Sequence, residues 1–317
     1  MQLKKVNSFV LKPVSPYNFE LTVHKPAGWW WSTPDEKFEK DTLWTATRFN
    51  DELIGLRIAS RGTTLEPQLE CDVFSQKRLD NSTRLKLEHM LSRALETEED
   101  LKEFYAFVAR DNILRDVTLD LCGMHTVAWP ELFPALILAV TLQMAPIKRS
   151  NQMMDLLMEH YGENLEFDAK TVRYWPSPKK IAATSVEELQ AKAKLGYRAK
   201  NLVAIANTLE AGFPSMDDLS RMDSNVAKKK LMTLRGIGEY SAEMVMPGMG
   251  FPLDVWSAKI FSILLLDKLS DDPREAITIL KKEADKRWGK WVGRVFVYVL
   301  NDLPRLSKRL GTDLTSF

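Results

Sequence analysis

The chain has almost no cysteine. Only Cys71 and Cys122 occur among its 317 residues, and two thiols so far apart cannot form the disulfide framework of a small secreted domain. Two thiols also exclude a four-cysteine iron–sulfur cluster, and none of the four histidines stands in a spacing that suggests a zinc site. A reduced, intracellular setting without a required cofactor is therefore expected.

The chain also lacks a long apolar run and an excess of charge of either sign. Its most apolar stretch, Leu132–Leu142, is too short for a membrane span of ~18 residues and predicts a buried helix. The opening MQLKKVNSFVLKPVSP has no apolar core, so we expect no signal peptide. The 44 Lys and Arg residues against 43 Asp and Glu give a net charge of +1, without the basic excess typical of nucleic-acid-binding proteins. Any binding to nucleic acid would have to use local charge and backbone groups.

Two halves of the chain differ in the period of their apolar residues. Residues 1 to about 80 alternate as strands do, and residues from about 83 onward repeat with helical spacing. The predicted strands are Phe19–Val23, Leu43–Thr47, Leu53–Ile58 and Leu69–Phe74, with Asn50-Asp51 as a hairpin turn. The predicted helices are 85–95, 101–108, Leu132–Gln143, Lys148–Tyr161, Val186–Ala193, Lys200–Glu210 and Asn225–Leu234, with shorter ones from Tyr240, Val255, Asp272 and Trp291.

This pattern predicts an α+β protein. We expect a small N-terminal antiparallel β-sheet domain with flanking helices, residues 1–115, whose sheet has one face buried. A large all-α part, residues 116–317, is expected to follow it. A length of 317 residues also fits two domains.

The most informative segment is a predicted helical hairpin over residues 225–246. Gly236-Ile237-Gly238 separates two helices there, and glycine permits a tight reversal because it tolerates positive φ. The second helix is expected to begin near Glu239 and to end before Pro247. Free N–H groups at its start, together with the helix dipole, can bind a phosphate with little side-chain charge. On its own, however, this glycine pattern indicates no more than a tight turn.

An aspartate follows the hairpin at the expected N-cap of a further helix, Val255–Leu266. Asp254 comes after a loop rich in glycine and proline, in the sequence Pro252-Leu253-Asp254. Any aspartate in front of a helix is by default only a cap. Its place after the hairpin is what makes it a candidate for chemistry.

The hairpin and the aspartate together resemble the helix-hairpin-helix Gly/Pro-Asp (HhH-GPD) superfamily of base-excision DNA glycosylases. The resemblance lies in the pattern L-x-G-I-G-x-(aromatic)-x-A over Leu234–Ala242, followed by the Gly/Pro-rich loop and P-x-D. Phe133–Gln143 looks like the family helix that ends in glutamine before the DNA-probing loop. Leu195–Lys200 is similar to the family's Leu-Gly-x-Arg-Ala turn, and Trp288–Tyr298 resembles its C-terminal helix with pocket aromatics.

The resemblance covers about residues 120–300. More weakly, the N-terminal sheet resembles the extra domain of bacterial 3-methyladenine glycosylase II and of 8-oxoguanine glycosylase. One departure concerns spacing, because Asp254 lies 14 residues after Tyr240 and better-known members have several more. A shortened second hairpin helix or loop is therefore expected, and the direction in which Asp254 points is left open.

The resemblance implies a catalytic role for Asp254. Cleavage of an N-glycosidic bond builds positive charge on the deoxyribose, and a carboxylate can stabilise that charge and orient water. In bifunctional members a lysine forms a Schiff base with the sugar, and this chain has Tyr240 where that lysine stands. A phenol cannot form the imine, so a monofunctional enzyme without β-lyase activity is implied.

The resemblance also implies roles in binding DNA and the flipped base. For contact with DNA it nominates Gly236, Gly238, Gln143, Met144, Arg198 and Lys200, with Met144 as a wedge or, as readily, a core residue. For the base pocket it nominates Tyr240, Trp256 and Tyr298, and more weakly Trp129, each of which could equally belong to a core. Backbone carbonyls of Met232, Leu234 and Ile237 would hold a structural Na⁺ or K⁺ ion.

The function implied is removal of damaged purines from double-stranded DNA in base excision repair, with alkylated bases such as 3-methyladenine as the leading substrates. One alternative is a glycosylase for oxidised or deaminated purines. Two others are a non-catalytic helix-hairpin-helix DNA-binding protein and a purely structural helical protein. We expect a monomer that acts in the cytoplasm or nucleoid without a membrane.

Overall fold

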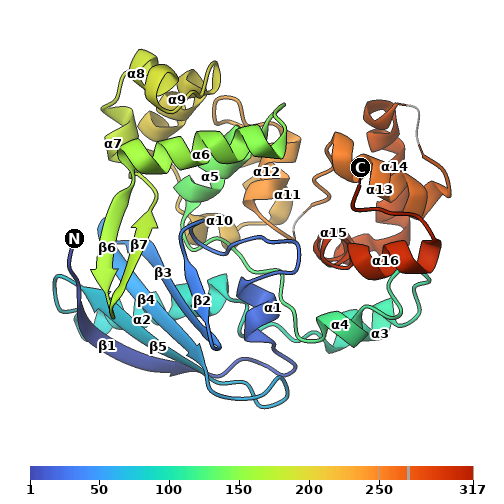
Figure 1. The fold of residues 1–317 in the computed structure, drawn as a ribbon, viewed down its shortest axis with the longest axis horizontal. Helices are drawn as coiled ribbons and strands as arrows, with labels where there is room; N and C mark the ends of the chain where they lie inside the picture. The colour runs from blue at the N-terminus through green and yellow to red at the C-terminus, as the bar shows by residue number, and fades with distance from the viewer. Residues whose placement is uncertain (249, 270–271, 317) are drawn as a thin grey trace.

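The computed structural model describes residues 1–248, 250–269 and 272–316. Figure 1 shows a sheet formed by the N-terminal part, with one group of helices above it and a second group at its side that contains the C-terminus. Among the described residues, none of the helices combines the length and apolar character needed to cross a membrane. The α+β architecture predicted from the sequence is confirmed.

Five antiparallel strands form the main sheet in the order β1-β5-β4-β3-β2. They are β1 (Lys4–Leu11), β2 (Lys37–Glu39), β3 (Thr42–Phe49), β4 (Glu52–Ser60) and β5 (Leu69–Ser75). The predicted turn at Asn50 and Asp51 is confirmed, since both residues have positive φ, 50° and 63°, as a two-residue hairpin turn requires. Strands β1 and β2 were not predicted.

The segment Phe19–Val23 is a helix, α1, and the prediction of a strand there is wrong. The residue that decides this is Asn18, whose side chain accepts the N–H of Leu21 at 3.0 Å and so caps a helix. The buried residues Phe19, Thr22 and Val23 follow helical spacing, which five residues were too few to distinguish from alternation.

The prediction that only one face of the sheet is buried is also wrong. Ile58 and Val73 pack on one face in a cluster that includes α2 (Asn81–Ala94). Leu53 and Phe74 pack on the opposite face in a cluster with the helices above the sheet. Because both faces are covered, the sheet is fixed to the helical part of the chain.

The helices above the sheet surround α5, the most apolar of them. This group comprises α5 (Leu132–Leu142), α6 (Ile147–Tyr161), α7 (Pro178–Ala182), α8 (Val186–Lys192), α9 (Arg198–Glu210), α10 (Met216–Ser220), α11 (Ser224–Leu231) and α12 (Glu239–Val245). It also contains a hairpin that the sequence did not predict, β6 (Glu163–Phe167) with β7 (Lys170–Tyr174). Phe167 of this hairpin lies against Gly55 of β4, where a Cβ would come within 2.7 Å of its ring.

The helices beside the sheet form a separate hydrophobic cluster. They are α3 (Lys102–Val108), α4 (Thr118–Leu121), α13 (Val255–Leu266), α14 (Pro273–Trp288), a short 3₁₀ helix (Gly289–Trp291), α15 (Val292–Asn301) and α16 (Leu303–Leu310). Phe104 of α3 is fully buried there together with Phe261 and Trp288. Helix α3 thus packs with the C-terminal helices, and the predicted domain boundary at residue 115 stays a prediction.

Candidate active site

The hairpin forms between α11 and α12 as the glycine pattern indicated. Asp223 begins α11 by accepting the N–H of Asn225 at 2.9 Å, and the N–H of Ile237 donates to the carbonyl of Leu234 at 3.1 Å within the turn. Only Gly236 of the two glycines has a positive φ, 78°. A side chain at this position would be strained by that conformation and would collide with a neighbouring helix.

Gly238 serves a different purpose from Gly236. It is the N-cap of α12 in an extended conformation, with φ −97°. A Cβ placed on it would meet no atom of the described residues within 4 Å, so the backbone there is open to solvent. The absence of a side chain leaves room for another molecule to approach the start of α12.

Asp254 caps α13 and is exposed to solvent. Its Oδ1 accepts both the N–H and the hydroxyl of Ser257, each at 2.7 Å, and the N–H of Asp254 donates to the Ser257 hydroxyl at 2.9 Å. This reciprocal capping box fixes the carboxylate at the start of the helix. Among the described residues, no hydrogen bond or ion pair engages Oδ2, which leaves this oxygen available for a ligand or water.

Tyr240 lies on the hairpin helix, near this carboxylate. Burial, and to a smaller extent the negative charge of Asp254, raise the pKa of the Tyr240 phenol. That influence requires the two side chains to be near each other. The spacing of 14 residues, short by comparison with the family, therefore still brings Asp254 to the hairpin.

Gln143 joins the end of α5 to the hairpin. Its Nε2 donates to the carbonyl of Gly236 at 2.7 Å and to the hydroxyl of Ser241 at 2.9 Å. The next residue, Met144, has a positive φ of 48°, and 82% of its side chain is exposed. It is therefore not a core methionine, and it projects from the surface beside the hairpin.

The two basic residues nominated on α9 have different surroundings. Lys200 is exposed and can reach solvent or a ligand. Arg198 is only 8% exposed, and its guanidinium stacks over the ring of Tyr197 at 4.6 Å and donates to the main-chain carbonyl of Gln143. The prediction that Arg198 contacts DNA is therefore not supported, because this side chain is already engaged within the protein.

The four aromatic residues nominated for the base pocket also differ in their exposure. Trp256, two residues after Asp254, is 36% exposed, and Tyr240 is half-buried near that carboxylate. Tyr298 is fully buried, and its hydroxyl donates to the carbonyl of Met124, so the expectation that it stacks on a base is corrected to a core position. Trp129 is similarly buried and packs edge-on against Trp30 at 5.3 Å. Neither Tyr298 nor Trp129 has a ring face free for a ligand.

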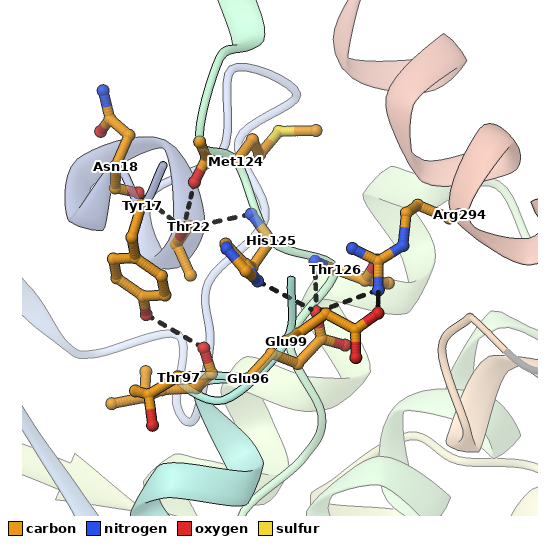
Figure 2. A network of polar contacts seen from close by, with 12 residues as sticks. Tyr17, Asn18, Thr22, Glu96, Thr97, Glu99, Met124, His125, Thr126 and Arg294 are labelled. Carbon is orange, nitrogen blue, oxygen red and sulfur yellow. Dashed lines mark hydrogen bonds and ion pairs between the residues drawn. The ribbon is translucent and has the colours of Figure 1, made fainter. Parts of the chain in front are cut away.

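A buried polar network around Glu96 was not predicted from the sequence (Figure 2). Glu96 accepts the N–H of Thr126 at 3.1 Å and lies 3.6 Å from the His125 ring and from the guanidinium of Arg294. Burial alone would raise the pKa of Glu96, but the neighbouring His125 ring and the charge of Arg294 bring it below its ordinary value. The lone arginine in the apolar helix α15 was the one sequence signal of this network.

The network fixes the elements that support Asp254. It joins residue 96, after α2, to the connection before α5 and to α15. Gly293, the neighbour of Arg294, packs so closely on Gly248 that a Cβ would come within 2.3 Å of the Gly248 carbonyl oxygen. Helix α15 therefore braces the loop that leads from the hairpin to Asp254.

Comparisons with known proteins agree with this geometry, although no family model matches the chain. The chain is 24% identical over 207 residues to the DNA-3-methyladenine glycosylase of Bacillus subtilis (strain 168). The aligned region covers 64% of this chain and 67% of that protein. The fold of the present chain is similar to that of a 3-methyladenine DNA-glycosylase from Archaeoglobus fulgidus, with a TM-score of 0.71. The two chains are 17% identical, and the match covers 96% of this chain and 99% of that one.

A second solved structure, the 8-oxoguanine glycosylase/lyase of Clostridium acetobutylicum, has a TM-score of 0.66 and 13% identity over 95% of this chain and 98% of that one. At such identities the two structures establish the fold, while the Bacillus protein shares sequence as well. The hairpin, the Gly/Pro-rich loop and the capping Asp254 lie in the arrangement that the motif predicted. In sequence the chain is similar to a DNA-3-methyladenine glycosylase and in fold to DNA glycosylases, as the resemblance of its motifs to the helix-hairpin-helix Gly/Pro-Asp superfamily led us to expect.

Proposed function

We propose that this protein is a monofunctional DNA glycosylase of base excision repair that hydrolyses the N-glycosidic bond of damaged purines, above all alkylated bases such as 3-methyladenine. The observation that carries the proposal is that Asp254, at the start of α13, lies near Tyr240 of the hairpin helix. The hairpin position at which bifunctional members have a lysine thus holds a phenol.

Asp254 would act on the sugar through its free oxygen. As the C1′–N bond breaks, the base leaves with the bonding electrons and the deoxyribose becomes positively charged. Oδ1 is held by Ser257, so Oδ2 can face the positive centre and stabilise it. Water then adds to C1′, and its proton passes to the carboxylate or to solvent, which leaves an abasic site and an intact strand.

Two aromatic residues suit an alkylated base. Alkylation at a ring nitrogen of a purine produces a cationic, electron-poor base, which is attracted to the face of an aromatic ring. Trp256 is exposed two residues after Asp254, and Tyr240 lies near the same carboxylate. These two residues are therefore our candidates for the wall of the base pocket.

Binding to double-stranded DNA would use the face that carries the hairpin and Met144. Gly238 leaves the start of α12 accessible to a phosphate, and Lys200 supplies an exposed positive charge. Met144 projects far enough to occupy the space of an extruded base. We propose that the protein does this as a monomer.

A monovalent cation at the hairpin also belongs to this proposal. The carbonyls of Met232, Leu234 and Ile237 lie in the turn region that Gly236 reverses, and carbonyl oxygens are ligands for such an ion. Leu234 already accepts the N–H of Ile237 at 3.1 Å, and its second lone pair can still face a cation. The ion would stabilise the turn and take no part in the hydrolysis.

The proposal is tested with a panel of duplex oligonucleotides. Each carries one lesion: 3-methyladenine, 7-methylguanine, hypoxanthine or 8-oxoguanine, with an undamaged duplex as control. We expect abasic sites with the alkylated purines, and strand breaks only after treatment with hot alkali. Strand cleavage without alkali, or a covalent adduct trapped by borohydride, would show that the enzyme is a lyase. Binding without any base release would favour the non-catalytic alternative.

A further inference from the structure

The turn after α5 holds a residue in an unfavourable conformation. Met144 has φ 48°, in the left-handed region that a residue with a Cβ rarely adopts. Its side chain is 82% exposed, so packing of that side chain does not hold the conformation. The neighbours of Met144 must therefore impose it.

Gln143, the residue before it, is fixed from two sides. Its side-chain amide donates to Gly236 and Ser241 of the hairpin at 2.7 and 2.9 Å. Its main-chain carbonyl accepts a hydrogen bond from the guanidinium of Arg198, at the start of α9. The peptide bond that joins Gln143 to Met144 is thus held by Arg198, and the side chain of Gln143 is held by the hairpin.

Arg198 is placed for this task and for no contact at the surface. It is 8% exposed and lies against the ring of Tyr197. The same face of α9 also reaches the hairpin, since a Cβ on Gly236 would come within 2.3 Å of the Asn201 amide. The first turn of α9 therefore touches both the turn that carries Met144 and the glycine turn.

We infer that Arg198 is a positioning residue, which fixes the left-handed Met144 turn relative to the hairpin so that the wedge is preformed before DNA binds. This inference rests on the proposed function, in which Met144 occupies the space of an extruded base. Without Arg198 the turn relaxes to ordinary backbone conformations, and its reordering must accompany each extrusion of a base. The defect then falls on base flipping and leaves the hydrolytic step at Asp254 unchanged.

The test compares Arg198→Met with Arg198→Lys, because a lysine can still donate to the Gln143 carbonyl. Single-turnover excision of 3-methyladenine is measured opposite thymine and opposite a tetrahydrofuran abasic-site analogue, where the base has no pairing partner. We expect Arg198→Met to lose about tenfold in rate on the paired base and to stay within about threefold of wild type on the unpaired base, because extrusion costs less there. Arg198→Lys should recover most of the loss.

A second measurement does not depend on catalysis. A duplex with 2-aminopurine beside a tetrahydrofuran abasic-site analogue reports unstacking by its fluorescence at saturating protein. Arg198→Met should lower this fluorescence, and its binding should keep the wild-type salt dependence. Lys200→Met on the same helix is the matched control, with a smaller salt slope and a wild-type ratio of paired to unpaired rates. If the wild type releases no base, the proposed function fails and the fluorescence still tests this inference.

Two results would overturn the inference. Equal losses on the paired and the unpaired base would show that Arg198 supports only the fold or the chemistry. If Arg198→Met reduced the salt dependence of DNA binding by the equivalent of about one phosphate contact, Arg198 would be identified as a phosphate contact. If Arg198→Met does not fold, Gln143→Met is used instead, because it removes the hydrogen bonds from the Gln143 side chain to the hairpin. The inference then requires that Gln143→Met lose excision rate on the paired base only.

Discussion

Tyr240 lies near Asp254, and burial, together with the smaller effect of this negative charge, raises the pKa of the Tyr240 phenol. Asp254 caps α13 and Tyr240 lies on α12, so this interaction connects the carboxylate to the hairpin. Asp254 thus remains close to the hairpin although only 14 residues separate it from Tyr240.

The pH profile of Tyr240→Phe should match that of the wild type at its alkaline end. Because the pKa of the phenol is raised above its ordinary value near 10, Tyr240 stays protonated throughout the working range. Single-turnover rates measured between about pH 6 and about pH 10 check this. If the wild-type rate declined at alkaline pH and the rate of the variant did not, that result would contradict the raised pKa of Tyr240.

Ser257→Ala should weaken both the fold and the reaction. The variant removes the hydroxyl that donates to Asp254 Oδ1 at 2.7 Å, and half of a capping box contributes about 1 kcal/mol to stability. We expect that loss in urea unfolding, together with a several-fold lower excision rate. Ser262→Ala on the same helix removes a hydroxyl that donates to the Ala258 carbonyl, and should lower stability alone. Equal rates for the two variants would show that the cap does not orient Asp254.

Met144→Ala should lower activity without lowering stability. A side chain that is 82% exposed contributes within about 0.5 kcal/mol to folding, so the melting temperature should not change. Excision of a paired base should slow by several-fold, because the smaller side chain fills less of the vacated space. Leu119→Ala, which removes another exposed apolar side chain, is the control. Equal activity in the wild type, Met144→Ala and Leu119→Ala would show that Met144 is not a wedge.

Lys25 should make stability depend on pH. Burial, opposed by the charges of Glu96 and Glu36, lowers the pKa of Lys25 from 10.5 to about 7. Between these values the unfolded chain holds a proton that the folded chain has released, so the free energy of unfolding rises with pH. This contribution is at most about 1.4 kcal/mol per pH unit. Denaturation at several pH values should show that slope reduced in Lys25→Met. An unchanged slope would mean that Lys25 keeps its proton when buried.

The sequence predicted those parts of the site that depend on neighbours along the chain. The hairpin, the cap at Asp254 and the end of α5 at Gln143 all follow from local signals, namely glycine, capping residues and helical periodicity. The same local signals misassigned Phe19–Val23, because alternation over five residues fits a strand and a short helix alike.

The roles of Arg198 and Tyr298 could not be predicted, because they depend on residues distant in the chain. Arg198 donates to a carbonyl 55 residues away, and the hydroxyl of Tyr298 reaches a carbonyl 174 residues away. Both residue types are common on DNA-binding surfaces, and only tertiary contacts show that these two are buried. The β6–β7 hairpin was missed for a related reason, since its partner surface at Gly55 lies on a distant strand.

The central claim is that the carboxylate of Asp254 stabilises the sugar cation, and Asp254→Asn tests it most directly. Asparagine caps a helix as well as aspartate does, so the variant should fold and should bind lesion-containing duplex within about threefold of wild type. The measurement is the single-turnover rate of 3-methyladenine release. We expect a loss of about a hundredfold or more. A variant that binds DNA and still releases the base at the wild-type rate would contradict the account.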